Sequence, residues 1–452
     1  MEKNEFDYKF KYTSIFSLNY FIQGINQSIF ATVVPVYLFT LLPSVNAAAI
    51  SFMLSFVLVP FILKLIYGLL SDKISLGKIG RRKPWIIGPA SFSGLMWIII
   101  SIMLNLNPLS AIGIFTYGGF LVILGVAMAD TAMDGFILDI CPKKLLGRTT
   151  GTVWAFRSIG TIVGGPLILL TINLIDLKII FIGLGIMTVL FSLITLNIRH
   201  VENLQGVNLI SNLKLIFKKR ENWKMFGFSF FMAIVDGVIF VFLALFLLIK
   251  LGLIEASGAT MDILEEDINL YSPQAFISFL TGVGVFLGAF IGGYIADKKS
   301  RRIAVFSSLG LTAGSLLLLL LPIPSTVIWL LFIFAGIVGS SSGWSNSAFS
   351  AVASQYSKQY PEATSTYYSI CTSFINFGTM LGLSFTGIVF NSISTITSDV
   401  LVVYGTVFIT MILFSSIALI PFLLLNRNIY ELKEIDLEQE KEISGDQAIL
   451  KP

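Results

Sequence analysis

Twelve long apolar runs make up most of this chain of 452 residues. Each run is long enough for a helix to cross the roughly 30 Å hydrocarbon core of a bilayer. The runs are continuous and do not alternate with polar residues, so they predict helices rather than barrel strands. Only 12% of the residues are charged, far fewer than in a soluble protein. We therefore expect an all-α polytopic membrane protein with spans near residues 15–42, 46–70, 84–104, 109–139, 149–174, 178–197, 224–250, 273–296, 302–322, 326–355, 364–391 and 398–425.

A short basic loop occurs twice, at positions almost half the chain apart. The first copy runs from Gly68 through Asp72 to Arg81 and Arg82, and the second from Gly293 through Asp297 to Arg301 and Arg302. In both, three residues separate the glycine from the aspartate, and basic residues follow. This repeat predicts two similar halves of six helices. The expected parts are a first bundle, a connector, a second bundle and an acidic tail, at residues 1–197, 198–223, 224–425 and 426–452.

The doubled loop resembles the motif between spans 2 and 3 of the major facilitator superfamily, with its weaker echo between spans 8 and 9. The resemblance implies that fold and a gate at the cytoplasmic end. The first loop would latch onto span 11 near Thr364, and the second onto span 5 near Thr149, when the protein faces outward. The simpler alternative is that the basic residues only fix the topology. The gate residues implied are Gly68, Asp72, Arg81, Arg82, Gly293, Asp297, Arg301 and Arg302.

Two further resemblances within that superfamily compete. The extended end of the first loop, Gly80 to Trp85, is similar to glycoside–pentoside–hexuronide cation symporters and plant-type sucrose transporters. The aspartates of span 4, Asp130-Thr-Ala-Met-Asp134, resemble a pattern in acetyl-coenzyme A carriers and muropeptide permeases. Span 5 departs from the drug antiporters because leucine and isoleucine follow Gly165-Pro166. The substrate therefore stays open.

The basic residues predict the orientation. If both termini lie on one side of the membrane, that side holds 26 of the 30 Lys and Arg residues. The bias makes this side cytoplasmic. No cleavable signal peptide is apparent in the polar start of the chain. We expect a multi-pass protein of the cell membrane with both termini in the cytoplasm, and a monomer suffices for this architecture.

Ionisable residues inside the spans are candidates for function, because they are costly in lipid unless they pair or face water. Asp130 and Asp134 lie one helical turn apart on span 4, and Arg157 of span 5 lies at a similar depth, with Lys64 of span 2 as a further cation. They form either a proton- or sodium-coupling site or a permanent salt bridge between spans 4 and 5. Asp139 reads as structural, near the basic residues Lys143, Lys144 and Arg148.

Further polar residues are candidates for the central cavity, which spans 1, 4, 7 and 10 line in the superfamily. Asp236 is the one acidic residue within the second half's spans, and we add it to the ion-coupling candidates. Amides and a tryptophan suit a polar solute, because hydrogen bonds orient it and an aromatic face stacks on a ring. The alternative is hydrogen bonding between helices. The substrate candidates are Gln23, Gln27, Trp344, Asn346 and Asn376.

These features together favour a secondary transporter that takes up a sugar, glycoside or similar polar metabolite with a proton or sodium ion. The alternative is a proton-coupled efflux antiporter for amphipathic compounds, and a receptor that binds without flux is also possible. The chain has a single histidine and no Cys/His cluster or phosphate-binding loop. We therefore expect no enzyme activity, no metal site, no cofactor beyond the coupling ion and no disulfide. The basic residues sit beside spans, so we expect no nucleic-acid partner.

Overall fold

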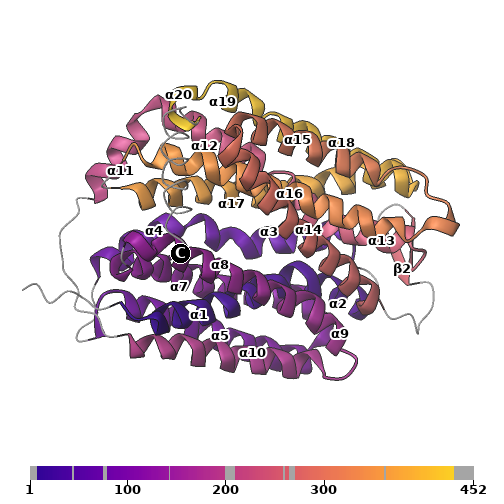
Figure 1. The fold of residues 1–452 in the computed structure, drawn as a ribbon. Coiled ribbons are helices and arrows are strands. Elements are labelled where there is room, and N and C mark those ends of the chain that lie inside the picture. The colour runs from indigo at the N-terminus through magenta and orange to yellow at the C-terminus, as the bar shows by residue number, and fades with distance from the viewer. Residues whose placement is uncertain are drawn as a thin grey trace, which may run out of the picture.

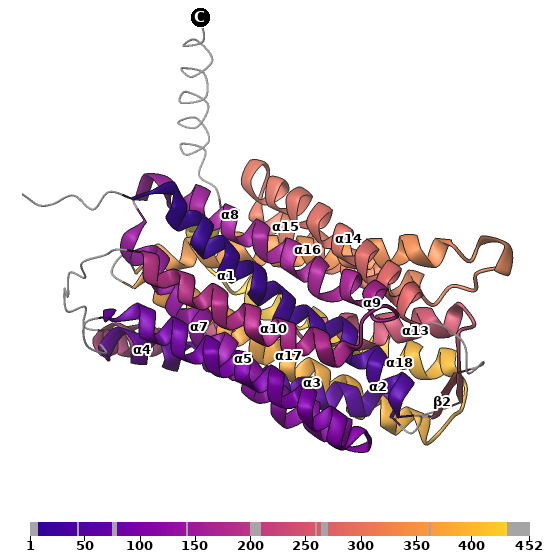
Figure 2. The ribbon, with the colours of Figure 1, turned by 90° about the horizontal axis from the view of Figure 1, so that it is seen from below.

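The computed structural model describes residues 8–42, 45–74, 79–141, 143–198, 209–257, 260–263, 270–360 and 363–431. Its helices run side by side along one long axis and divide into two bundles (Figure 1). The first bundle, drawn in indigo to magenta, lies beneath the second, drawn in orange to yellow. The view turned by 90° shows the same helices aligned along this axis (Figure 2). Of the acidic tail expected at residues 426–452, the structure describes only the start, up to residue 431.

Six spans form the first half, and bulges or breaks divide some of them into several helical segments. The segments are α1 (Phe10–Ser28), η1 (Ile29–Val33) and α2 (Val34–Leu41); α3 (Ala47–Ile62) and α4 (Lys64–Lys73); α5 (Arg82–Leu106); η3 (Pro108–Ser110), α6 (Ala111–Gly113), η4 (Ile114–Gly118) and α7 (Gly119–Ile140); α8 (Lys143–Ile162), η5 (Val163–Leu167) and α9 (Ile168–Thr171); and α10 (Leu177–Leu193) with η6 (Ile194–Asn197).

Six more spans follow in the second half. Its segments are α11 (Leu209–Lys218); α12 (Arg220–Met232), η7 (Val238–Phe242) and α13 (Leu243–Lys250); the hairpin of β1 (Ile254–Ser257) and β2 (Thr260–Ile263); α14 (Tyr271–Lys298); α15 (Arg301–Leu318); η8 (Ser325–Val327) and α16 (Leu330–Ser357); α17 (Thr364–Ser394); α18 (Val400–Ser416) and α19 (Leu419–Leu423); and α20 (Arg427–Tyr430).

The twelve-helix fold expected from the sequence is confirmed. In the described residues, nine of the spans are continuous enough and apolar enough to cross a membrane by length and composition alone. Spans 7, 9 and 10 are less apolar or less regular. Span 7 is interrupted, α15 begins with Arg301 and Arg302, and α16 carries a run of serines.

The structure shows detail in two segments that the sequence did not predict. Span 7 was expected to be continuous, but the helix is interrupted between Met232 and Val238. The intervening sequence, Ala-Ile-Val-Asp-Gly, contains β-branched residues, an aspartate and a glycine, which are poor helix formers. Within the expected connector 198–223, residues 209–218 form α11, whose Ile216 is buried in the core of the second half.

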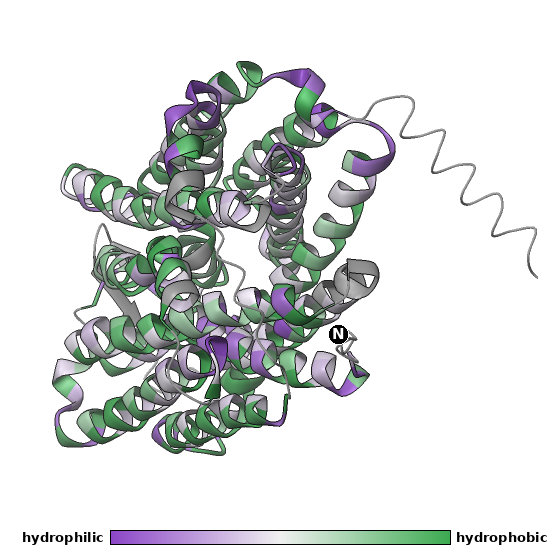
Figure 3. Ribbon diagram, turned by 90° about the vertical axis from the view of Figure 1, so that its left-hand side faces the viewer, coloured by the Kyte–Doolittle hydropathy of each residue, from purple (hydrophilic) through white to green (hydrophobic). Residues whose placement is uncertain are grey.

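The two ends of the bundle differ in character. We call the end that carries Arg81, Arg82, Arg301 and Arg302 the basic end, and the other, which carries the β1–β2 hairpin, the opposite end. Viewed from the basic end, the outer ribbon is mainly hydrophobic, and hydrophilic segments lie at helix ends and toward the middle (Figure 3). A hydrophobic periphery around a more polar middle is what a bundle surrounded by lipid requires.

The two halves share a core over only part of their length. One cluster of buried apolar residues includes side chains of both halves, among them Phe39, Val45, Leu247 and Phe390 toward the opposite end. Near the basic end each half has a cluster of its own. Among the described residues, Leu65 is the first-half side chain that packs against the second half's cluster there. The halves are therefore joined toward the opposite end.

Hydrogen bonds between the halves follow the same distribution. The Ser51 hydroxyl donates to the carbonyl of Leu383 over 2.6 Å, and the Ser55 and Ser384 hydroxyls lie 2.6 Å apart. At the opposite end, the hydroxyls of Thr40 and Tyr271 lie 2.9 Å apart. These contacts join spans 2 and 11, and spans 1 and 8.

Candidate functional site

A buried ion pair lies in the middle of the first half. The Lys64 ammonium contacts the Asp130 carboxylate, and only 1% of the Asp130 side chain is exposed. Lys64 is the first residue of α4, directly after a break in span 2. Pro60, three residues before the break, lacks the backbone N–H that would bond to the carbonyl of Phe56, which weakens the last turns of α3. The break therefore sets the position from which Lys64 reaches span 4.

Asp134 has a different environment, although it lies one turn from Asp130. The buried hydroxyl of Tyr20, on α1, donates a hydrogen bond to its carboxylate. Asp134 is exposed, and Tyr368 of the second half lies within electrostatic range of it. The Asp130 carboxylate is thus buried in an ion pair with a lysine, while the Asp134 carboxylate faces the space between the halves.

Arg157 does not form the expected ion pair with the span 4 aspartates. Its guanidinium donates to the amide oxygen of Gln27 over 2.7 Å and lies 4.6 Å from the ring centre of Trp154. It lies within electrostatic range of both Asp130 and Asp134 without a direct contact. The reason is competition, because Lys64 occupies Asp130 and Tyr20 occupies Asp134.

We call Tyr20, Gln23, Gln27, Lys64, Asp130, Asp134, Trp154 and Arg157 the polar cluster. The cluster contains two carboxylates and two cations, so its formal charges balance. With Arg157 as the one cation, a negative charge would have been left over. Gln23 is buried beside Asp130, and its side-chain oxygen has no hydrogen-bond partner among the described residues. It borders a cavity of about 30 Å³, enough for one water molecule, together with Asn19, Asn26 and Thr188. The cluster can exchange hydrogen-bond partners without creating net charge.

Sequence reasoning missed Tyr20 and Trp154. Tyr20 lies three and seven residues before Gln23 and Gln27, so all three share one face of α1. That spacing was a usable signal. Trp154 lies three residues before Arg157, and a cation over a tryptophan ring is a recurrent favourable contact.

The second half carries one ionisable group at comparable depth. Asp236 lies in the interrupted part of span 7 and is half-buried. Its nearest polar partner is the hydroxyl of Thr379 on span 11, at 3.5 Å. Asp236 therefore lies apart from the polar cluster, on the other bundle.

The three remaining cavity candidates fall into different places. Trp344 packs against Gly292 of α14, and its indole N–H donates to the carbonyl of Ala304 on α15 over 3.1 Å. This contact supports a role in helix packing rather than in the cavity. The Asn376 amide donates to the carbonyl of Phe61 over 3.3 Å, across the interface between the halves. Asn346 is exposed.

The arginines of the first basic loop bind their own half. Arg81 and Arg82 contact the same oxygen of Asp139 at 3.0 and 2.8 Å, and Arg82 also donates to the Ser71 hydroxyl at 2.9 Å. Asp139 was expected beside Lys143, Lys144 and Arg148, whose side chains lie outside the described ones, as does that of Asp72. Among the described side chains, these contacts clamp the loop onto the end of span 4.

The second basic loop is also engaged within its own half. The backbone N–H of Arg301 donates to the Glu431 carboxylate at 2.9 Å, and its guanidinium donates to the carbonyl of Tyr430 at 2.7 Å. A carboxylate at the start of α15 satisfies backbone N–H groups that have no partner within the helix. Asp297 is exposed. The contacts of Arg301 among the described residues thus lie within the second half, in agreement with two halves that have separate cores at the basic end.

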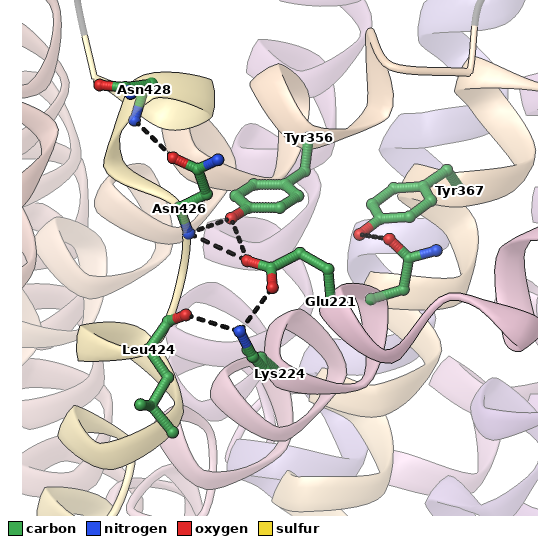
Figure 4. Close-up of polar contacts among 8 residues, drawn as sticks. Glu221, Lys224, Tyr356, Tyr367, Leu424, Asn426 and Asn428 are labelled. Atoms are coloured by element: carbon green, nitrogen blue, oxygen red, sulfur yellow. Dashed lines mark hydrogen bonds and ion pairs between the residues drawn. The ribbon is translucent and has the colours of Figure 1, made fainter.

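Glu221 joins the start of α12 to the segment after span 12 (Figure 4). Its carboxylate accepts hydrogen bonds from Lys224 at 2.5 Å, from the Asn426 backbone at 2.9 Å and from Tyr356 at 3.2 Å. Burial favours a higher pKa for Glu221, but these hydrogen bonds outweigh it and lower the pKa below its ordinary value. Glu221 precedes the seventh apolar run, at the basic end.

Replacing Glu221 with glutamine is expected to lower thermal stability at neutral pH. Because the folded-state pKa is lowered, the stabilisation by the carboxylate is present above its unfolded pKa and is lost as the pH falls through the folded value. The parent and Glu221→Gln should therefore converge in acid. Melting curves over a pH series measure this, with Glu255→Gln on the exposed hairpin as the control. A constant difference at every pH would contradict the prediction.

The chain is similar in sequence to a transporter family and to proteins that are named as transporters. The sequence model of the Major Facilitator Superfamily matches residues 16–261 and 254–449. A protein of Rickettsia conorii named as the transporter AmpG 1 is 26% identical over 384 residues, which cover 82% of this chain and 87% of that protein. A protein of Arabidopsis thaliana named as folate-biopterin transporter 7 is 25% identical over 163 residues, 34% of this chain and 36% of that protein.

Solved structures with the same fold also match. The nucleoside transporter NupG aligns with a TM-score of 0.65 and 14% identity, covering 91% of this chain and 98% of that one. A bacterial homologue of the human lysosomal transporter Spinster, in an inward-facing and occupied conformation, aligns with a TM-score of 0.57 and 16% identity, covering 92% and 96%. Likenesses at this identity concern the fold alone.

Proposed function

This chain belongs to the major facilitator superfamily, and from that premise we propose that it is a secondary active transporter for a small polar solute, working by alternating access as a proton- or sodium-coupled symporter. A sugar, glycoside or similar metabolite is the proposed cargo. The partial relative named for folate and biopterin makes polar heterocycles worth testing beside sugars. We further propose that the protein acts as a monomer in the cell membrane.

The observation that carries the proposal is the uneven joining of the halves. They share a core and hydrogen bonds toward the opposite end but have separate cores at the basic end. Alternating access requires such an arrangement, in which two bundles close at one end and part at the other around a site near the midplane. From the excess of basic residues we infer that the basic end is cytoplasmic. On that orientation the structure corresponds to an inward-facing state.

The polar cluster supports a site for a polar solute near the midplane. Asp134, Trp154 and Arg157 bring together a carboxylate, an aromatic face and a guanidinium that is bound to a neutral amide rather than to an acid. Such groups can orient a hydroxylated or zwitterionic molecule and stack on its ring. Because Gln27 is a neutral partner, a substrate carboxylate or hydroxyl could replace it at Arg157 without leaving a charge behind.

Flux in proteoliposomes tests the proposal. Sugars, glycosides, muropeptides, pterins and nucleosides would first be screened by thermal shift of the purified protein, because a bound ligand raises the melting temperature. Each hit would then be followed under an imposed proton or sodium gradient. Accumulation against the solute's gradient supports symport, whereas efflux in exchange for incoming protons identifies an antiporter. Binding without flux in any gradient would overturn the transport function.

Locking the opposite end is expected to stop transport. The Ser55 and Ser384 hydroxyls lie 2.6 Å apart across the halves, so cysteines placed there are close enough to form a disulfide. In a background lacking Cys141 and Cys371, Ser55→Cys/Ser384→Cys should lose flux on oxidation and regain it on reduction. Each single cysteine variant is the control. Full flux through an oxidised, cross-linked protein would contradict alternating access through this interface.

A further inference from the structure

The two halves repeat one tight helix contact. In the first half, a Cβ on Gly160 of α8 would lie 2.0 Å from the carbonyl oxygen of Phe21 on α1. In the second half, a Cβ on Gly378 of α17 would lie 2.1 Å from the carbonyl oxygen of Phe230 on α12. One turn further along, Gly164 meets Ile25 and Gly382 meets Ile234 in the same way. Spans 1 and 5 therefore correspond, residue by residue, to spans 7 and 11.

This correspondence pairs residues of different chemistry. Two residues beyond Ile25 lies Gln27, and two beyond Ile234 lies Asp236. Three residues before Gly160 lies Arg157, and three before Gly378 lies Ile375. The first half thus holds a neutral amide and a guanidinium at the two positions where the second half holds a carboxylate and an apolar side chain.

Asp236 has no resident counter-charge among the described residues. Its one hydrogen-bond partner is Thr379, at 3.5 Å, and no lysine or arginine interacts with it. Asp130, by contrast, is sealed by Lys64, and Asp134 lies within range of both Lys64 and Arg157. A carboxylate at this depth is costly unless something neutralises it. A cation from solution is the remaining source.

The backbone around Asp236 departs from the α-helix. The N–H groups of Asp236, Gly237 and Val238 bond to carbonyls three residues back, as in a tight turn rather than an α-helix. A Cβ on Gly237 would lie 2.5 Å from the backbone nitrogen of Leu383, so the turn is pressed against α17. Interrupted spans with carbonyls and a carboxylate near the midplane are typical places for coupling ions in transporters.

The same place touches the contact between the halves. Thr379 directly precedes Met380, whose carbonyl accepts a hydrogen bond from Ser55 of the first half at 2.9 Å. The Ser55 hydroxyl also contacts Ser384, one turn further along α17. A charge gained or lost at Asp236 therefore acts on the helix that joins the halves.

We propose that Asp236, with Thr379 and the turn 233–237, is the binding site of the coupling cation, a proton or a sodium ion. The proposal rests on the proposed transport function and assigns the ion to the second half. The Lys64–Asp130 pair then has its own internal cation and does not exchange one with solution. The first half contributes solute contacts, and the second contributes the ion.

Two substitutions test the site from opposite directions. Asp236→Asn removes the charge, and it should reduce uphill accumulation to the equilibrium level while solute exchange continues. Ile375→Arg supplies the resident cation that the first half has, and it should also abolish ion-driven accumulation although the carboxylate is intact. Asp399→Asn is the matched control. Its aspartate caps α18 at the opposite end, and asparagine caps equally well.

A readout without transport separates the two proposals. The melting temperature of the purified protein would be followed against sodium at constant ionic strength, with choline as the replacement, and against pH without sodium. If sodium is the ion, it raises the melting temperature of the parent and not of Asp236→Asn. Thr379→Val then weakens the effect by removing an oxygen ligand. If the proton is the ion, sodium has no effect and a pH gradient alone drives accumulation in the parent.

The outcomes are distinct. Uphill accumulation and a parent-like ion response in Asp236→Asn would overturn the ion site and leave the transporter standing. A sodium response that depends on Asp236, in a protein without flux, would support the ion site and overturn the transport function. Should Asp236→Asn fail to fold, Asp236→Glu keeps the charge, and together with Ile375→Arg it decides the question.

Discussion

Replacing Lys64 with methionine is expected to abolish transport and to destabilise the protein more than any other single charge removal in the first half. Asp130 is 1% exposed and has Lys64 as its ion-pair partner. Removing one partner of a buried pair leaves an uncompensated charge and costs roughly 3–5 kcal/mol. Methionine keeps most of the side-chain volume, so the loss of stability is due to the missing charge and not to a cavity. Thermal melting and flux in proteoliposomes measure the two effects.

A second substitution should restore the stability lost in Lys64→Met. In Lys64→Met/Asp130→Asn neither charge remains, and replacing both partners of a buried pair is often close to neutral. We expect a melting temperature near that of the parent. Flux separates a structural pair from one that rearranges during the cycle. A stable but inactive double variant places the pair in the transport cycle, and a stable, active one makes it structural.

The control is a lysine whose side chain is less buried and whose carboxylate partner is exposed. Lys178 lies at the opposite end, with its nearest carboxylate, Asp176, 4.0 Å away. Exposed pairs of this type contribute about 0–1 kcal/mol. Lys178→Met should therefore behave like the parent. If Lys64→Met melts like Lys178→Met, Asp130 is neutralised in some other way and the interpretation of the pair is wrong.

Much of the fold could be predicted because its causes are local in the sequence. A run of about 20 apolar residues must form a helix in lipid whatever its neighbours are. The repeated loop around Asp72 and Asp297 predicted two halves without any tertiary information. The interruption of span 7 was missed, although Val235, Asp236 and Gly237 are adjacent poor helix formers. Apolar content masked that weak signal.

The partners within the candidate site were harder to predict, because they depend on the rotation of each helix about its axis. Depth along the chain placed Arg157 level with Asp130 and Asp134 but could not say which of the two it faces. In the structure Arg157 donates a hydrogen bond to Gln27, and Asp130 forms an ion pair with Lys64. Lys64 reaches span 4 from the break in span 2, and a one-residue change in such a break turns a side chain by about 100° around a helix with 3.6 residues per turn.

The contacts that the basic loops make could likewise not be predicted from the sequence. The pattern of Gly, Asp and Arg residues identifies the loops but not the conformation in which they lie. In this structure Arg82 holds Asp139, and Arg301 holds Tyr430. Both contacts lie within one half. The same residues can form a latch between the halves or a clamp within one half. Which of the two forms depends on whether the two cores at the basic end are joined or separate, and here they are separate.

Replacing Gly288 with alanine is expected to break the packing of spans 8 and 10. A Cβ at this position would lie 1.9 Å from the carbonyl oxygen of Ser340 and 2.7 Å from its Cα. These are backbone atoms of α16, so the helices must separate to admit the methyl group. Overpacking of this kind typically costs about 1–3 kcal/mol, and the backbone contact places Gly288→Ala at the upper end. Melting of the detergent-purified protein measures it.

The same helix offers its own control for Gly288→Ala. Gly282 lies on α14 as well, but a Cβ there would meet nothing within 4 Å. Alanine is the better helix former by roughly 0.5–1 kcal/mol, so Gly282→Ala should melt at or above the parent's temperature. The two variants make an identical chemical change on one helix, and only the approach of α16 differs. Equal melting temperatures would show that spans 8 and 10 lie further apart than in this structure. The close approach of Gly343 to Val285, on the same pair of helices, would then also be wrong.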